Sequence, residues 1–158
     1  MNEEQYSRAN KRVLLAIVVV FGYIAATLML ALVVSQGGHA SKIMMEAVTA
    51  AAVIVISVAA YLGKRTTRTC AVIMTLSMMI GYFVIVQLNT TVGTWTYGLP
   101  LLIAAMVYLD KKIVMMTNGI ALVAIIVHLV RCFLGGGSDL RNNVIGLFVL
   151  LLTAYACN

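Results

Sequence analysis

The sequence predicts an all-α membrane protein with six transmembrane helices, and three observations lead to that prediction. The 158 residues are 63% hydrophobic and 10% charged, with a mean hydropathy of +1.04, which is typical of membrane spans rather than of a soluble core. The apolar residues gather into six long stretches, and a helix needs roughly 20 such residues to cross about 30 Å of hydrocarbon. The Lys and Arg residues fall in alternate gaps between the stretches. Because irregular backbone cannot face lipid, each stretch is expected to be an α-helix.

The first two expected spans are Val13–Ser35 and Ile43–Gly63. The first follows the basic pair Lys11–Arg12, and basic residues also precede the apolar core of a signal peptide. That core, however, has only about 7–15 residues. We therefore expect this run to be retained as a membrane helix. The second ends with Tyr61 followed by Lys64 and Arg65, and a tyrosine followed by basic residues is typical of a helix end at the headgroup level.

The third and fourth expected spans are Cys70–Leu88 and Val92–Leu109. The third contains Ser77 and Gly81 at the small-x-x-x-small spacing that allows two membrane helices to approach closely. The fourth contains Pro100, which should kink the helix or loosen its first turns. The pairs Gly22 and Ala26, and Ala59 and Gly63, have the same small-residue spacing.

The last two expected spans are Ile113–Phe133 and Leu140–Cys157, which complete three helical hairpins. Asn118 in the fifth span can bridge helices through its amide. The sixth span reaches full length only if its helix begins near Ser138 or Asp139, residue types that cap helix N-termini. It also lacks basic residues after Tyr155, so we expect this chain to be the N-terminal portion of a longer protein.

Charge orients the predicted bundle. With the N-terminus in the cytoplasm, the outer side carries three basic residues and the cytoplasmic side carries the other eight: Arg8, Lys11, Arg12, Lys64, Arg65, Arg68, Lys111 and Lys112. Cytoplasmic loops of membrane proteins carry an excess of Lys and Arg, so both termini are expected inside. Residues 1–12 would form a cytoplasmic tail and residues 13–158 a six-helix transmembrane domain. The net charge of +6 would meet anionic lipid headgroups rather than nucleic acid.

Catalytic and metal chemistry lack sequence support. The chain contains no nucleophile elbow, phosphate-binding loop or His-Glu-x-x-His motif, so we do not expect an enzyme. Its three cysteines are isolated, and no His, Cys or carboxylate cluster has ligand spacing. Met74 and Met78 lie one turn apart, but flexible packing explains them better than a copper path. Neither a metal nor a cofactor is predicted.

Polar residues in the apolar stretches gather toward the outer side, and two interpretations remain open for them. They could line an outward-facing pocket, because ionisable groups in a membrane face the bundle interior or a wet cavity. Alternatively, they are interfacial residues at helix ends, with Glu46 paired to Lys42 at i, i+4 spacing. Gln87 and His128 lie deepest and favour the pocket. The candidate ligand-binding residues are Gln87, Trp95, Tyr97, His128 and Arg131.

Several segments together resemble the N-terminal membrane region of a group of bacterial methyl-accepting chemotaxis proteins found in clostridia-like bacteria. The segments that carry the resemblance span nearly the whole chain: Ala9–Leu15 (ANKRVLL), Tyr61–Arg65 (YLGKR), Gly93–Pro100 (GTWTYGLP), Tyr108–Lys112 (YLDKK), Asn118 and His128–Arg131 (HLVR). In that family a multi-helix membrane region replaces the usual periplasmic sensor. A long cytoplasmic helical hairpin, which is not part of this sequence, contacts a histidine kinase and a coupling protein.

The resemblance implies a sensor and anchor region of a chemotaxis-receptor-like transducer in the bacterial plasma membrane, acting as a homodimer. Repacking of the helices would be relayed through the sixth helix to the cytoplasmic coiled coil, and through it to the kinase and the coupling protein. One alternative is a small six-helix substrate-binding subunit of a vitamin-type transporter, and another is a passive membrane anchor.

Overall fold

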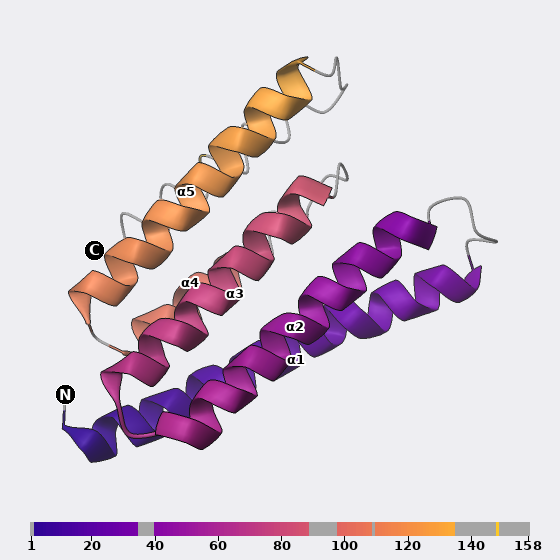
Figure 1. The fold of residues 1–158 in the computed structure, drawn as a ribbon. Coiled ribbons are helices and arrows are strands. Elements are labelled where there is room, and N and C mark those ends of the chain that lie inside the picture. Colours follow the sequence, from indigo (N-terminus) through magenta and orange to yellow (C-terminus); the bar gives the residue numbers. More distant parts are fainter. Residues whose placement is uncertain (1, 35–39, 89–97, 109, 135–147, 149–158) are drawn as a thin grey trace.

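The computed structural model describes residues 2–34, 40–88, 98–108, 110–134 and 148, and the secondary structure within these ranges is helical, without a strand. Five helices follow one another: α1 (Glu3–Val34), α2 (Ala40–Lys64), α3 (Arg68–Leu88), α4 (Gly98–Met106) and α5 (Lys111–Leu134). The helices run side by side, as Figure 1 shows. Four of them, α1, α2, α3 and α5, are long and apolar enough to cross a membrane. The predicted all-α class is therefore confirmed for the described residues, and these four helices are compatible with a membrane protein.

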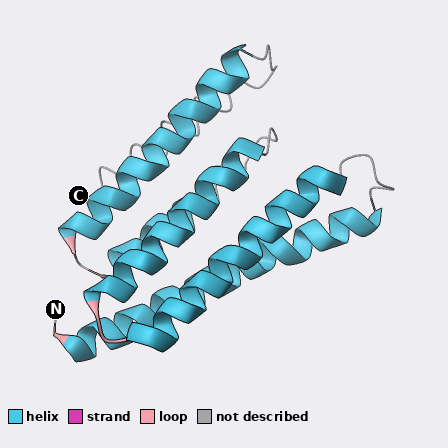
Figure 2. Cartoon of the chain, viewed as in Figure 1, coloured by secondary structure: helices cyan, strands magenta, loops and turns pink. Residues whose placement is uncertain are grey.

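The fourth and sixth expected spans are the ones that the described helices do not reproduce. α4 has nine residues, or about 13 Å of helix, which is too short to cross about 30 Å of hydrocarbon. It ends in a turn at Val107 and Tyr108, where the chain reverses toward α5 (Figure 2). Residues 92–97, and the sixth stretch Leu140–Cys157 apart from Phe148, lie outside the described ranges. The count of six spans stays a prediction.

α1 begins ten residues earlier than the expected span, so most of the segment expected as a polar tail is helical. Asn2 and Gln5 explain the early start. The Gln5 backbone N–H donates to Oδ1 of Asn2, and the Asn2 N–H donates to Oε1 of Gln5, both at 2.9 Å. This reciprocal pair satisfies two donors that a helix N-terminus otherwise leaves open. Glu3 and Glu4 in the first turn also suit the positive end of the helix dipole.

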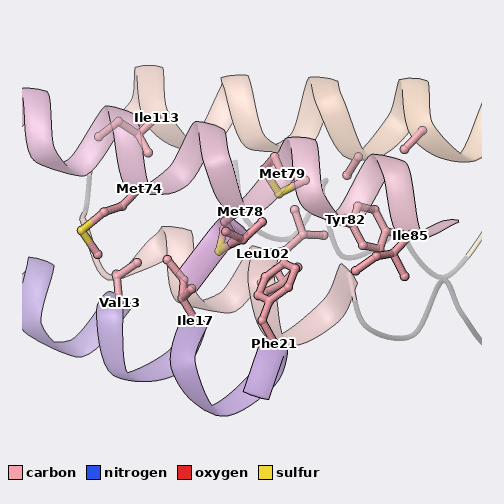
Figure 3. Close-up of a cluster of buried hydrophobic side chains, with 14 of the residues drawn as sticks. Val13, Ile17, Phe21, Met74, Met78, Met79, Tyr82, Ile85, Leu102 and Ile113 are labelled. Carbon is pink, nitrogen blue, oxygen red and sulfur yellow. The ribbon is translucent and has the colours of Figure 1, made fainter. Parts of the chain in front are cut away.

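α3 is the central helix of the described bundle and contacts each of the other four. Ten of its residues are buried, against four on α2. Val13, Ile17 and Phe21 of α1 point toward Met74 and Met78 of α3, with α4 and α5 completing the core (Figure 3). The three α1 residues recur at every fourth position, so they form one face of the helix.

The predicted charge asymmetry is visible in the arrangement of the helices. The beginning of α1, the turn between α2 and α3, and the beginning of α5 lie at one end of the bundle (Figure 1). Two polar links join these segments, Asn10 to the turn and Arg68 to Asp110. All eight basic residues expected on the cytoplasmic side belong to these segments, and we call this the basic end. Among the described residues the opposite end, called the far end below, carries Lys42 and Arg131.

Candidate functional site

Three of the five predicted ligand-binding residues come together where α3 and α5 approach each other at the far end. Gln87 is the penultimate residue of α3, and its side-chain Nε2 donates to the Ala124 carbonyl at 2.8 Å. His128 of α5 hydrogen-bonds to the backbone of Val86. The Arg131 guanidinium donates to the Gln87 carbonyl. We call Gln87, His128 and Arg131 the polar cluster.

The end of α3 explains why Arg131 is held there. The last four carbonyls of a helix have no intrahelical donor and carry the negative end of the helix dipole. Gln87 lies in that last turn, so its carbonyl is a favourable acceptor for a cation from a neighbouring helix. Arg131 lies in the last turn of α5, at the same depth of the bundle. The contact therefore fixes the far ends of two parallel helices against each other.

The polar cluster retains hydrogen-bonding capacity. Oε1 of Gln87 is buried and makes no hydrogen bond to any residue in the described ranges. An unpaired buried acceptor costs about 1–3 kcal/mol, so a ligand that donates to this oxygen would recover free energy. Arg131 has five N–H donors in total, and the Gln87 carbonyl engages only part of that set. The arrangement suits a small ligand with a hydrogen-bond donor beside an acceptor or an anionic group.

The other polar residues considered in the sequence analysis lie either outside the described ranges or buried within helices. Trp95 and Tyr97, which complete the predicted pocket, fall in residues 89–97 and lie outside the described part of the chain. Glu46 is buried on α2 and 2% exposed, which differs from the surface position that an interfacial pair with Lys42 would give it. Asn118 is likewise buried, on α5.

The described residues contain no cluster of side chains that could coordinate a metal ion. No group of three or more His, Cys, Asp or Glu residues there is arranged to hold a metal ion. Met74 and Met78 are fully buried in the core. The Cys70 thiol lies 3.4 Å from Sδ of Met74 within the same helix. This sulfur pair belongs to the packing of the core.

Sequence reasoning missed the two polar links at the basic end. Nδ2 of the fully buried Asn10 donates to the Arg65 carbonyl at 2.8 Å and to the Thr67 carbonyl at 3.4 Å. Arg68 donates to both carboxylate oxygens of Asp110, at 2.8 and 3.3 Å. One signal was present for Asn10, because it precedes Val13 and Ile17 at helical spacing and so extends their buried face.

Asp110 also fixes the start of α5. Its Oδ1 accepts the backbone N–H of Lys112 at 3.0 Å, as an N-cap residue does. Partial burial raises the pKa of this carboxyl, but the hydrogen bonds from Arg68 and Lys112, the Arg68 charge and the Ile113 N–H together outweigh it. The pKa of Asp110 is therefore lowered from its ordinary value of 3.8.

A lowered pKa in the folded state predicts an acid-dependent contribution to stability. The ionised Asp110 stabilises the fold above its ordinary pKa of 3.8, and this contribution disappears as the pH falls through the lowered value. We expect Asp110→Asn to cost up to about 1 kcal/mol at pH 7, because Arg68 is half exposed. Thermal unfolding in detergent should show the difference at pH 7 and its loss in strong acid. Glu4→Gln, which removes an exposed pair with Arg8, should change stability little at either pH, and a pH-independent difference for Asp110→Asn would contradict the assignment.

Comparison with protein-family models, with curated proteins and with solved structures gives no match for this chain. The described residues form an all-α bundle in which four helices are long and apolar enough to cross a membrane. Within these residues, the bundle has one end rich in cations and a polar cluster between α3 and α5 at the other end.

Proposed function

We propose that this chain is the membrane sensor and anchor region of a bacterial signal transducer similar to methyl-accepting chemotaxis proteins. In this proposal the chain crosses the plasma membrane six times as three hairpins, with both termini in the cytoplasm, and acts as a homodimer. The sixth helix leads into a cytoplasmic signalling region that contacts a histidine kinase and a coupling protein. One observation carries the proposal: polar contacts link α3 and α5 at both ends, whereas apolar residues pack between these contacts.

This arrangement supports a relay along parallel helices. A ligand bound to the polar cluster would compete for the hydrogen bonds of Gln87 and Arg131, and so change how α5 sits against α3. Met74, Met78 and Met79 fill the core face of α3, and unbranched methionine side chains repack readily. A shift between two packings that differ by a few kcal/mol would then reach the basic end.

Distance measurements at the basic end, in variants altered at the far end, test this mechanism. Spin labels at the exposed Lys64 and Lys111, in the full chain with its three cysteines replaced by alanine, report the separation of α2 and α5 at the basic end. We expect Arg131→Gln combined with Gln87→Leu to shift or broaden the distance distribution in lipid vesicles. Lys42→Gln, a charge loss at the far end but outside the polar cluster, should leave it unchanged. Identical distributions in all three proteins would indicate a passive anchor.

The natural reading frame provides a second test, which separates a receptor from a transport subunit. We expect several hundred further codons after Asn158, encoding heptad-patterned helix rich in Glu and Gln. A stop codon directly after Asn158 would contradict the proposed connection to a kinase.

A further inference from the structure

A groove lies near the basic end, on the face of α1 that points away from the bundle core, and it is lined by both cationic and apolar residues. Its volume is about 580 Å³, within the range of about 300–1,000 Å³ typical of ligand sites. Arg8, Lys11 and Arg12 line one part of it. Leu14, Leu15 and Val18 of α1 line the remainder, with Tyr61 of α2 as the contribution of the neighbouring helix.

The lining of the groove changes along α1 from the basic end toward the far end. The cations occupy positions 8–12 and the aliphatic residues positions 14–18, so the lining changes from charged to apolar over about 15 Å of helix. The opposite face of α1, with Ala9, Val13 and Ile17, is buried in the bundle. Leu15 is 65% exposed, so the apolar half of the groove faces the hydrocarbon of a surrounding bilayer.

Two of the three cations have no acidic partner in the part of the chain that the structure describes. Arg8 pairs with Glu4, one turn earlier on α1. Lys11 and Arg12 are exposed, and neither forms an ion pair within the described ranges. They are the cations nearest to the apolar part of the lining along α1, where the phosphate of a lipid would sit if its acyl chain lay along Leu15 and Val18.

We propose that this groove binds one anionic phospholipid of the leaflet at the basic end. Lys11 and Arg12 contact the phosphate and the charged headgroup. An acyl chain lies over Leu14, Leu15 and Val18, and Tyr61 contacts the interfacial part of the lipid, where tyrosine side chains are enriched. This order of charged and then apolar contacts matches a phospholipid along its length, whereas a soluble phosphate would engage only the basic part. The site is independent of the polar cluster.

The experiment must separate a defined site from the general attraction of cations to anionic membranes. The purified full chain is placed in phosphatidylcholine nanodiscs, and binding of added phosphatidylglycerol is measured by native mass spectrometry. Lys11→Gln combined with Arg12→Gln should weaken binding roughly thirtyfold, because both direct contacts to the phosphate are lost and each contributes about 1 kcal/mol. Lys111→Gln combined with Lys112→Gln removes the same charge from the same end outside the groove, and should weaken binding less than about twofold.

A second variant tests the apolar half. Val18→Trp fills the groove without changing charge, and should reduce phosphatidylglycerol binding while helical content by circular dichroism stays unchanged. Equal losses in the two double variants would show diffuse attraction and overturn the proposal. Full competition by soluble glycerol phosphate, or unchanged binding by Val18→Trp, would also overturn it, because either result would reduce the site to a phosphate contact.

Discussion

Replacing Gly81 with alanine is expected to destabilise the bundle by about 1–3 kcal/mol, as overpacking of a filled interior does. A Cβ on Gly81 would overlap Cγ2 of Val53 and lie 3.2 Å from Cε1 of Phe21. Neither neighbour can withdraw easily. Val53 is β-branched and holds one preferred rotamer in a helix, and Phe21 is fully buried. The contact joins α1, α2 and α3, so the substitution strains three helices together.

Two other glycines provide the matched control for this prediction. A Cβ on Gly22 or on Gly119 would meet no neighbouring atom within 4 Å. Alanine is the better helix former by about 1 kcal/mol, so Gly22→Ala and Gly119→Ala should leave stability unchanged or raise it. Unfolding by sodium dodecyl sulfate in mixed micelles, followed by circular dichroism, measures all three variants. If Gly81→Ala proved as stable as Gly22→Ala, the close approach of α2 and α3 would be wrong.

The comparison among glycines shows which structural features the small-residue spacing predicts and which it does not. Of the three pairs named above, Ser77 and Gly81 lie at the contact between α2 and α3. There the Ser77 and Ser57 hydroxyls are 3.1 Å apart. Gly22 and Gly63 have the same spacing signal but face open space. The spacing predicts a narrow helix face, and contains no information about which helix packs against it.

The expected spans agree with α2, α3 and α5 to within a few residues, because long apolar runs bounded by basic residues have few structural alternatives in a bilayer. The central position of α3 could not be predicted in the same way. In a soluble helix the buried face is the apolar one, but here lipid-facing residues are apolar too. Leu15 is exposed and Ile17 is fully buried, although the two side chains differ little in hydropathy.

Polar residues were better predictors of buried polar contacts where the surrounding sequence was apolar. Gln87 and His128 were selected because polar groups within a span face the bundle interior, and the structure places them together with Arg131. Asn10 and Asp110 were missed because each lies beside basic residues near a helix end, where polar side chains are common. Solvent-exposed and buried polar residues cannot be distinguished there by composition.

Asn10→Asp is expected to have the largest effect of any isosteric change at the basic end. The Asn10 amide donates to the carbonyls of Arg65 and Thr67, and an ionised carboxylate can only accept. The substitution would therefore place a negative charge against two carbonyl oxygens at a position with 0% exposure. We expect a loss of about 3–5 kcal/mol, as for other buried charges without a partner. Asn10→Ala, which removes the amide without introducing a charge, should cost about 1–3 kcal/mol.

Gln5→Glu makes the same amide-to-carboxylate change on the same helix and isolates the role of the donor. Oε1 of Gln5 accepts the Asn2 N–H, and a carboxylate accepts that bond equally well near the positive end of the helix dipole. This variant should stay within about 0.5 kcal/mol of the natural protein. The defect of Asn10→Asp should also diminish in acid, because protonation of the introduced carboxylate restores one donor toward the α2–α3 turn. Equal stabilities of the two variants at pH 7 would mean that the amide of Asn10 does not hold α1 to that turn.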